Sequence, residues 1–259
     1  MTTTAPAFRI EGLSVKYGST LALDSLNAEI PHGIVTGLVG PNGSGKTTLL
    51  RTMYGALTPS QGRVLLNGRP LASLTPRTIS REISVVVQQS FTPHRMSVLD
   101  EVLLGRMPFV PDFSPYRDED RRLALEALEA VGMSDKSRRR SDELSGGERQ
   151  RVVIARALAQ GSRCILLDEP TNHLDIRYQH EVLGLLRDLG RTVVVVLHDL
   201  NMAARYCDRV HILSAGRMHS VGPAEQVLLE STIAELYGVA ASRIEHCGRP
   251  QFLFTSPTR

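Results

Sequence analysis

Short apolar runs rich in β-branched residues recur along the chain and are separated by longer amphipathic stretches. Such runs, bounded by Gly, Pro or polar clusters, are typical of β-strands. The pattern predicts strands at residues 8–17, 26–29, 34–39, 62–66, 83–87, 164–167, 193–197 and 209–214. Because most of these strands alternate with helical stretches, we expect an α/β fold with a mostly parallel sheet covered by helices.

Two segments depart from this alternation. In the first part of the chain, polar residues alternate with apolar ones and turn residues stand at 17–18 and 31–33, which predicts an N-terminal antiparallel β-subdomain. Between the strand at 83–87 and residue 141 the strand signal disappears, and the pattern predicts helices at 97–107 and 118–131 with a Pro-rich link at 108–115. We therefore expect one domain, residues 1–259, made of a core (1–90 and 142–225), an inserted helical subdomain (91–141) and a short C-terminal extension (226–259).

A glycine-rich loop follows the strand predicted at 34–39 and leads into a helix predicted at 46–54. Its glycines let several backbone N–H groups point at one anion, at the positive end of the helix dipole. Lys46 supplies a cation for the outer phosphates of a nucleotide, and Thr47 supplies a hydroxyl for Mg²⁺. The alternative is an ordinary glycine-rich turn that carries a lysine. The candidate nucleotide-binding residues are Gly40, Pro41, Asn42, Gly43, Ser44, Gly45, Lys46, Thr47 and Thr48.

Two carboxylates end the apolar strand predicted at 164–167. Beside a phosphate loop, Asp168 is placed to hold Mg²⁺ directly or through water, and Glu169 stands one step further out, where an attacking water would lie. The alternative is a strand that ends in a charged turn.

A second glycine-rich segment starts another helix. Ser145 and Glu148 form a capping box, and the helix is expected to end at Gly161. A capping box needs no ligand, which is the structural alternative. However, Gly146 and Gly147 each cost about 1 kcal/mol of helix propensity, and a cap gains nothing from them. We therefore predict that this helix start lets an anion approach bare N–H groups.

The composition of the chain limits the kinds of partner and the compartment that we expect for it. Thirty basic and 27 acidic residues give a net charge of +3, and the charges are spread along the chain, so we expect no nucleic-acid partner. Three cysteines without a CxxC spacing fit a reduced, cytoplasmic compartment, and Cys164 is expected in the core. The longest strongly apolar stretches fall far short of the roughly 18 residues that a spanning helix needs. If the protein works at a membrane, we expect another chain to cross it.

Together these motifs resemble the nucleotide-binding subunits of ATP-binding cassette (ABC) transporters, over nearly the whole chain. The resemblance implies a P-loop NTPase (RecA-like) core that binds ATP and Mg²⁺ and hydrolyses ATP. It also implies a head-to-tail dimer, in which the Ser145-Gly146-Gly147 helix of one subunit closes over the ATP held by the other. The implied partners are transmembrane permease subunits and, indirectly, a substrate-binding protein. The implied location is the cytoplasmic face of the cell membrane.

Four further residues match motifs of this family. Gln88 matches the glutamine that contacts Mg²⁺ and the water, although Gln89 beside it leaves the assignment ambiguous. Tyr17 matches the aromatic residue that stacks on adenine, and His198 matches the histidine that contacts the γ-phosphate. Asp175, in the segment 171–175, matches the aspartate that links the two sites of the dimer. Taken singly, Tyr17, Gln88 and His198 each have an ordinary structural explanation, and the resemblance rests on their joint order and spacing.

The subfamily is indicated by weaker signals. Segments 104–108, 171–176, 222–223 and 236–239 look like those of importers for iron-siderophores, haem and cobalamin, although Val87 stands where that group commonly has proline. The resemblance makes a ferric siderophore the expected cargo, with haem or cobalamin as the runners-up. The alternative is a soluble ABC-type ATPase that is not coupled to transport. We also expect residues 91–107 to dock the permease through Phe91, Met96, Val98 and Leu99, unless Val98 and Leu99 pack inside the helical subdomain.

Overall fold

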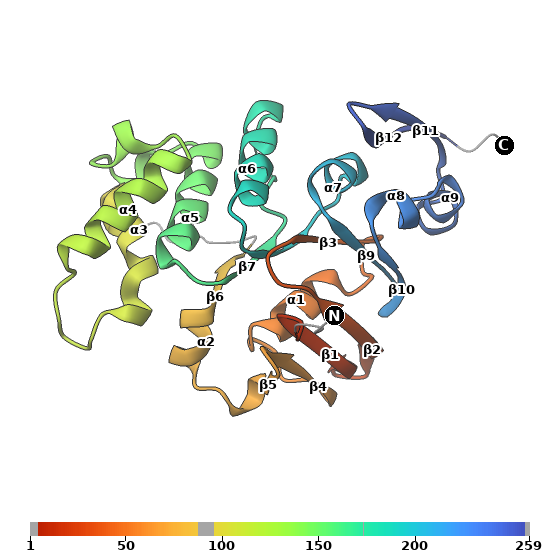
Figure 1. Cartoon of the computed structure of the whole chain (residues 1–259), viewed down its shortest axis with the longest axis horizontal. Helices are drawn as coiled ribbons and strands as arrows, with labels where there is room; N and C mark the ends of the chain where they lie inside the picture. The colour runs from red at the N-terminus through yellow and green to blue at the C-terminus, as the bar shows by residue number, and fades with distance from the viewer. Residues whose placement is uncertain (1–4, 88–95, 173, 257–259) are drawn as a thin grey trace. The chain divides into compact units, whose positions relative to one another are not determined.

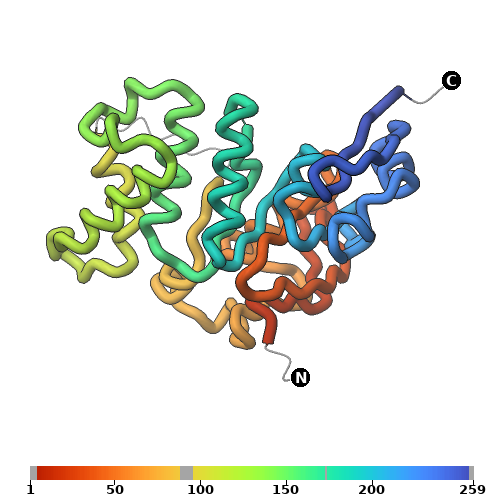
Figure 2. The backbone as a smooth tube through the Cα atoms, turned by 45° about the horizontal axis from the view of Figure 1, so that its top comes forward, coloured from red at the N-terminus to blue at the C-terminus, as the bar shows by residue number. Residues whose placement is uncertain are grey.

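The structure is a computed structural model, which describes residues 5–87, 96–172 and 174–256. The chain divides into two units, one formed by Met1–Leu74 with Gly190–Arg259 and the other by Thr75–Leu189. Figure 1 names the elements of each unit and Figure 2 follows the backbone through them. The predicted functional boundaries near residues 90 and 141 do not coincide with this division, and they stay a prediction.

An antiparallel sheet forms the N-terminal part of the first unit. Its strands lie in the order β2 (Thr20–Ile30), β1 (Phe8–Tyr17), β4 (Gln61–Leu66) and β5 (Arg69–Pro70). The predicted antiparallel subdomain is therefore confirmed. Strand β2 begins well before the predicted residue 26, because a tight turn pairs Tyr17 with Thr20 and carries polar residues into the ladder.

Four further strands of the first unit lie side by side in the order β10 (Arg217–Gly222), β9 (Arg209–Ser214), β3 (Val35–Val39) and β8 (Thr192–Val196). Strand β3 runs parallel to both of its neighbours, and every residue of β3 and β8 is buried. Continuous apolar runs of this kind are typical of parallel strands covered on both faces. Helix α1 (Lys46–Met53) contacts β8, and helix α7 (Leu200–Tyr206) contacts β3.

The C-terminal extension folds onto the same unit, although the sequence analysis assigned no elements to it. It contains helices α8 (Ala224–Val227) and α9 (Glu230–Tyr237) and the hairpin β11 (Ala240–His246) and β12 (Arg249–Thr255). The side-chain amide of Asn201 in α7 bonds both backbone groups of Phe252 in β12, at 3.1 Å to the carbonyl oxygen and 2.7 Å from the N–H. This pair of bonds fastens the hairpin to α7.

The second unit combines two parallel strands with helices. Strand β6 (Ile83–Val86) pairs with β7 (Cys164–Asp168), and Cys164 is buried as expected. The helices are α2 (Pro76–Glu82), α3 (Val98–Leu103), α4 (Asp118–Ala130), α5 (Gly146–Gln160) and α6 (Ile176–Asp188). Helices α3, α4 and α5 pack on one another, as Figures 1 and 2 both show. The predicted helices at 118–131 and after Ser145 are confirmed.

The helix predicted at 97–107 is wrong in its second half, because α3 ends at Leu103 and a 3₁₀ segment, Leu104–Phe109, follows. Pro108 has no N–H to continue an α-helix. Gly105 lies so close to the neighbouring backbone that a Cβ there would be 2.2 Å from the carbonyl oxygen of Arg156. The predicted Pro-rich link therefore begins with helical turns that pack tightly on α5.

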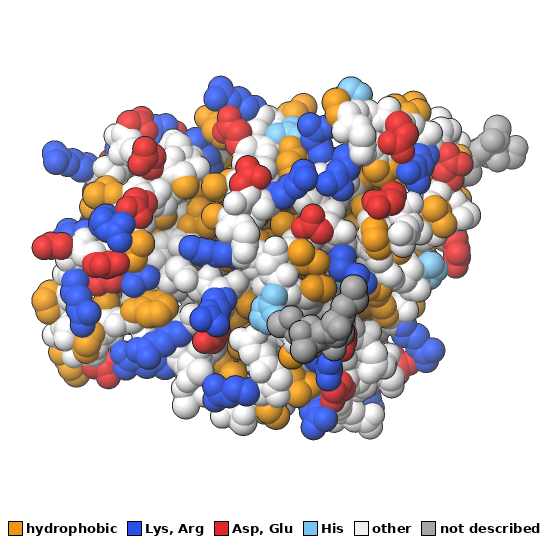
Figure 3. Space-filling model, in the orientation of Figure 1, with side chains coloured by type: hydrophobic (Ala, Val, Ile, Leu, Met, Phe, Trp, Pro, Cys, Tyr) orange, Lys and Arg blue, Asp and Glu red, His pale blue; other side chains and the backbone are white. Residues whose placement is uncertain are grey.

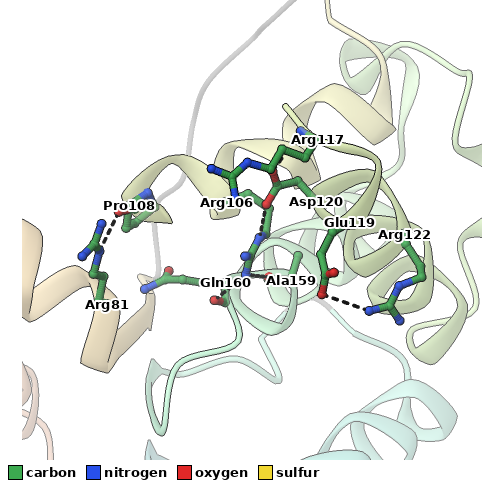
Figure 4. A network of polar contacts seen from close by, with 9 residues as sticks. All are labelled: Arg81, Arg106, Pro108, Arg117, Glu119, Asp120, Arg122, Ala159 and Gln160. Atoms are coloured by element: carbon green, nitrogen blue, oxygen red, sulfur yellow. Dashed lines mark hydrogen bonds and ion pairs between the residues drawn. The ribbon is translucent and has the colours of Figure 1, made fainter. Parts of the chain in front are cut away.

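A buried ion pair holds this 3₁₀ segment in place (Figure 4). Arg106 Nε donates to Asp120 Oδ1 at 2.9 Å, and Arg106 Nη1 donates to the carbonyl oxygens of Ala159 and Gln160 at 3.0 Å each. Burial, the largest single influence, acts to raise the pKa of Asp120, but the hydrogen bonds from Arg106 and from the N–H of Arg117, together with the two arginine charges, outweigh it, so the pKa lies below its usual value. One arginine therefore joins the 3₁₀ segment, α4 and the carboxyl end of α5.

The surface carries mixed charge, and basic and acidic side chains are interspersed over the face shown in Figure 3. Within the described ranges, no helix is both long and apolar enough to cross a membrane.

Candidate nucleotide site

The glycine-rich loop lies between the end of β3 and the start of α1. Gly40, Gly43 and Gly45 have φ angles of 146°, 77° and 101°, which residues with a Cβ rarely adopt. A Cβ on Gly40 would lie 2.1 Å from the carbonyl oxygen of Leu213 and 2.8 Å from Ser44 Oγ. The loop therefore needs glycine both for its curvature and for its close packing.

The donors of this loop fit an anion. Helix α1 begins after Gly45, which has no side chain to cap it, and has no acidic residue in its first turn, so no negative side chain stands at the positive end of its dipole. Ser44 Oγ is buried and has no hydrogen-bond partner. A buried polar group without a partner is rare and needs an explanation. The phosphates of a nucleotide would supply acceptors for the N–H groups at the start of α1 and for the Ser44 hydroxyl.

Lys46 is held inside the loop. Its side chain is buried, and Nζ donates to the carbonyl oxygens of Gly40 at 2.8 Å and Pro41 at 2.9 Å. Asn42 and Gly43 are exposed at the tip of the loop, and Thr47 and Thr48 are half-buried in the first turn of α1. The structure therefore places all the residues predicted from this motif around one curved segment.

His198 lies at the same edge of the sheet as the glycine-rich loop. Strands β3 and β8 are parallel neighbours, and the N–H of Leu197 donates to the carbonyl oxygen of Leu38 at 3.1 Å. Asp199 begins α7 as its N-cap, accepting from the N–H groups of Asn201 and Met202, so exposed His198 stands on a short, fixed loop. Tyr17, the last residue of β1, is 47% exposed, as a ring that stacks on a base must be.

The carboxylates predicted from the sequence lie in the second unit. Asp168 is the buried last residue of β7, and Glu169 follows it with a φ of 53°. This conformation is strained for a residue other than glycine, and such strain gathers at functional sites. Asn172 Nδ2 donates to Glu169 Oε2 at 2.7 Å, so this amide orients the carboxylate. From the sequence, Asn172 belongs only to a family motif, because hydrogen bonding between side chains has no signature in the sequence.

The start of α5 is the capping box that the sequence predicts. Ser145 Oγ accepts from the N–H of Glu148 at 3.3 Å, and Glu148 Oε2 accepts from the N–H of Ser145 at 2.8 Å. Lys136 forms an ion pair with Glu148, and this contact, together with the bond from the Ser145 N–H, lowers the pKa of Glu148 to about 2. Lys136 was not among the predicted residues, because it lies outside the motif.

Two features of this helix start are not explained by packing within the chain. Ser145 and Gly146 are exposed, and a Cβ added to Gly146 would meet no atom within 4 Å. The chain itself therefore has room for a side chain where it carries glycine.

Asp175 has a structural role that the sequence analysis did not assign to it. It is the N-cap of α6, and its Oδ1 accepts from the N–H of Tyr178 at 3.0 Å. Ile176 beside it is 75% exposed. The role of Asp175 between two copies stays a prediction. Gln88 and Gln89 lie outside the described residues, and so does His173.

The predicted docking segment is only partly described, because Phe91 lies outside the described residues. Val98 is fully buried, so this residue packs inside the unit and does not present a surface. Met96 and Leu99 are half-buried. Their backbone is paired with the segment 137–141, since the N–H of Leu99 donates to the carbonyl oxygen of Ser137 at 2.9 Å.

The comparisons with known proteins agree with one another. Residues 23–172 match the sequence profile of the ABC transporter family. The iron(3+)-hydroxamate import ATP-binding protein FhuC of Bacillus subtilis is 39% identical over 235 residues, 89% of this chain and 87% of that protein. The ferric enterobactin transport ATP-binding protein FepC of Escherichia coli is 37% identical over 249 residues, 95% of this chain and 92% of that protein. The dimeric structure of a bacterial ABC transporter cassette has a TM-score of 0.76 and 31% identity, covering 84% of this chain and 98% of that one. The chain therefore belongs to the ABC transporter family, as one of its ATP-binding, ATP-hydrolysing subunits.

Proposed function

We propose that this chain hydrolyses ATP to drive an importer of ferric siderophores. The observation that carries the proposal is the glycine-rich loop before α1, where an uncapped helix start, an unpartnered Ser44 hydroxyl and a buried Lys46 converge. These groups match the charge and the acceptors of nucleotide phosphates. The relatives named above supply the class of cargo, since both are named for iron uptake.

Each site residue has a role in this proposal. Lys46 and the N–H groups of the loop hold the outer phosphates, and Tyr17 stacks on the adenine. Glu169, oriented by Asn172, polarises the attacking water, and His198 contacts the γ-phosphate. Mg²⁺, held by Thr47, Asp168 and Gln88, would neutralise the charge on the phosphate oxygens when bound. The hydroxyl and carboxylate oxygens among these groups are the ligand type that Mg²⁺ prefers.

The exposed start of α5 supports a head-to-tail dimer. We infer that Ser145, Gly146 and Gly147 of one copy close over the ATP bound by the other, with Asp175 near the contact. The open space at Gly146 is what such a contact needs, because a phosphate oxygen must come within hydrogen-bond distance of backbone N–H groups.

The remaining partners follow from the importer assignment. We infer that permease subunits hold the chain at the cytoplasmic face of the membrane and that a substrate-binding protein delivers the cargo to them. The segment from Phe91 to Met107 is our proposed dock, without buried Val98. The same proposal includes the division of the chain into a core, an inserted helical subdomain at residues 91–141 and a short C-terminal extension at residues 226–259.

The dimer is tested by the dependence of ATP hydrolysis on protein concentration. Initial rates of the full chain should rise faster than linearly at low concentration, and size-exclusion chromatography with ATP should show a dimer. The Lys46→Ala variant should show neither, because it loses the phosphate contact. Rates strictly proportional to concentration, with no dimer in the presence of ATP, would contradict the head-to-tail proposal.

The cargo is tested by deleting the gene and measuring uptake of labelled ferric siderophore, haem and cobalamin. Loss of ferric siderophore uptake, restored by the wild-type gene and not by Lys46→Ala, is the expected result. Loss of haem or cobalamin uptake instead would correct the cargo and keep the importer. Unchanged uptake of all three, with no redundant ATPase present, would favour an ATPase that is not coupled to transport.

A further inference from the structure

The turn between β9 and β10 lies against the glycine-rich loop. The N–H of Gly216 in this turn donates to the carbonyl oxygen of Ser44 at 3.1 Å. The carbonyl oxygen of Gly216 accepts from the N–H of Asp24, a residue of β2, at 2.9 Å. Gly216 therefore joins the loop to a neighbouring strand through its backbone alone.

Only glycine allows this close approach. A Cβ on Gly216 would lie 2.8 Å from the carbonyl oxygen of Ala22, and a Cβ on Gly45 would lie 2.9 Å from the same oxygen. Neither position has room for a side chain unless the backbone moves. The turn and the loop therefore both pack backbone against backbone on β2.

The bond to Ser44 fixes the direction of one donor of the loop. No described peptide bond is cis, so the carbonyl oxygen of Ser44 and the N–H of Gly45, which share one planar peptide, point in opposite directions. With the carbonyl oxygen of Ser44 bonded to Gly216, the N–H of Gly45 points away from the turn. Gly45 stands directly before α1, at the positive end of the helix dipole. The turn therefore sets the orientation of a donor that stands where an anion would bind.

A pair of charged side chains also holds the turn on β2. Arg217 Nε and Nη2 both donate to Asp24 Oδ2, at 2.9 and 2.5 Å. Asp24 therefore bonds the turn twice, through its backbone N–H to Gly216 and through its carboxylate to Arg217. Strands β10 and β2 also contact each other.

We propose that Gly216 is a positioning residue for ATP binding, whose N–H holds the Ser44 carbonyl oxygen and so aims the Gly45 N–H at the nucleotide phosphates. The Asp24–Arg217 pair keeps the turn in place. This inference rests on the proposed function of the same loop. Gly216 acts through the peptide between Ser44 and Gly45 and not by contact with the phosphates. A donor that is oriented before the ligand arrives loses less conformational entropy on binding, which increases affinity.

The Gly216→Ala variant tests this proposal, with Gly68→Ala as the matched control. Both glycines have a φ of 76° and stand second in a two-residue turn between antiparallel strands, so alanine meets the same backbone strain at each. A Cβ on Gly68 would meet no atom within 4 Å, whereas one on Gly216 would displace the turn. We expect the Kd and the KM for ATP to rise together by about 3- to 10-fold in Gly216→Ala, the worth of one net hydrogen bond. The kcat should stay within about twofold, and Gly68→Ala should bind ATP like the wild type.

The Asp24→Ala variant tests the same proposal without crowding the turn. Loss of a negative charge near the loop would by itself strengthen the binding of anionic ATP, whereas a loosened turn weakens it. The sign of the change therefore separates positioning from a charge effect, and we expect Kd and KM to rise by about 2- to 5-fold, the range of an exposed ion pair. Glu11→Ala is the control, because it removes the same charge from the Glu11–Arg63 pair of the N-terminal sheet and should leave both constants unchanged.

Three results would overturn the proposal: unchanged or tighter ATP binding in Gly216→Ala and Asp24→Ala, a fall in kcat with KM unchanged, or an equal rise in KM in the two controls. The third would show a general effect of lost stability. If Gly216→Ala does not fold, the sign measured with Asp24→Ala decides alone. Fluorescent ATP titrated into the wild type and into Lys46→Ala separates this test from the proposed function. If the wild type bound no ATP, or Lys46→Ala bound it equally well, the proposed role of the loop would itself be wrong.

Discussion

Helices α1 and α5 both begin at a glycine-rich segment, but only α5 carries its own cap. Helix α1 starts at Gly45 with no side-chain hydrogen bond to its first turn, beside the buried side chains of Ser44 and Lys46. Helix α5 starts at Ser145, whose side chain and that of Glu148 bond each other's backbone N–H groups, and it lies open to solvent. The same helix dipole is therefore set in two different surroundings.

This difference indicates how the N-terminal end of each helix would contact a phosphate. The α1 end has a cation, a glycine cradle and the unpartnered Ser44 hydroxyl within one unit, which fits our proposal that it holds the nucleotide phosphates. The α5 end has used its cap on its own backbone, and Lys136 compensates the charge of Glu148 there. We propose that it contributes bare backbone at Gly146 to a phosphate that the other copy already holds. Three predictions test this contrast.

The largest effects are expected from two variants that separate ATP hydrolysis from ATP binding. Glu169→Gln should lower ATP turnover by about 10²- to 10⁴-fold, the usual contribution of a general base, and should retain ATP and keep the dimer closed. Lys46→Ala should instead lose ATP binding, since a lysine contact near 4 Å contributes up to about 4 kcal/mol before desolvation is subtracted. Single-turnover hydrolysis and nucleotide affinity, measured on both variants, compare the two roles.

Glu181→Gln serves as the control for the first prediction. Glu181 is an exposed carboxylate of α6 that pairs with Arg177, so its loss should change neither rate nor affinity. If Glu169→Gln and Lys46→Ala had the same affinity for ATP, the assignment of binding to one residue and chemistry to the other would be wrong.

The second prediction concerns the open face of α5. Gly146→Ala should lower ATP hydrolysis by about 10²-fold, which is the usual effect of displacing a reacting group by 1 Å, because the added methyl would lie where we propose that the other copy's phosphate approaches. Stability should not fall, since the methyl meets no atom of its own chain and alanine favours a helix by about 1 kcal/mol over glycine. Urea unfolding and steady-state ATPase rates measure the two effects separately.

Ser145→Ala gives the matched contrast to Gly146→Ala. It removes the cap and should lower the free energy of unfolding by about 1 kcal/mol. Full ATPase activity in Gly146→Ala would mean that this helix start is only a cap, and the contrast with α1 would then lose its functional meaning.

Much of this contrast could be predicted from the sequence, because it depends on local patterns. The turn at Gly40–Gly45 and the capping box at Ser145 are set by residues close together in the chain, and the buried strands are continuous apolar runs. The 3₁₀ segment was missed because the close approach of Gly105 to Arg156 joins residues far apart in sequence. Lys136 and Asn172 were missed or undervalued for the same reason, since each acts through a side-chain contact that its motif does not specify.

The smallest effect is the pH dependence of the α5 cap. The pKa of Glu148 falls to about 2 in the folded chain from 4.5, first through Lys136 and then through the Ser145 N–H. A depressed carboxyl pKa stabilises the fold above pH 4.5, and that stability is lost as the pH falls toward 2. Lys136→Met should therefore lower the free energy of unfolding by about 1.5–3 kcal/mol at neutral pH. The variant should also lose less stability than the wild type between these two pH values, as measured by urea unfolding at each pH.

Arg177→Met supplies the control for the cap, because the Arg177–Glu181 pair has the same charges at a far more exposed position. Its side chains are 79% and 48% exposed, against 25% and 19% for Lys136 and Glu148. Exposed pairs contribute about 0–1 kcal/mol, so this variant should leave the acid limb of the stability curve nearly unchanged. If Lys136→Met behaved in the same way, Lys136 would not be holding Glu148. The start of α5 would then carry an uncompensated negative charge, which repels the phosphate it is proposed to receive, and the dimer geometry would need another explanation.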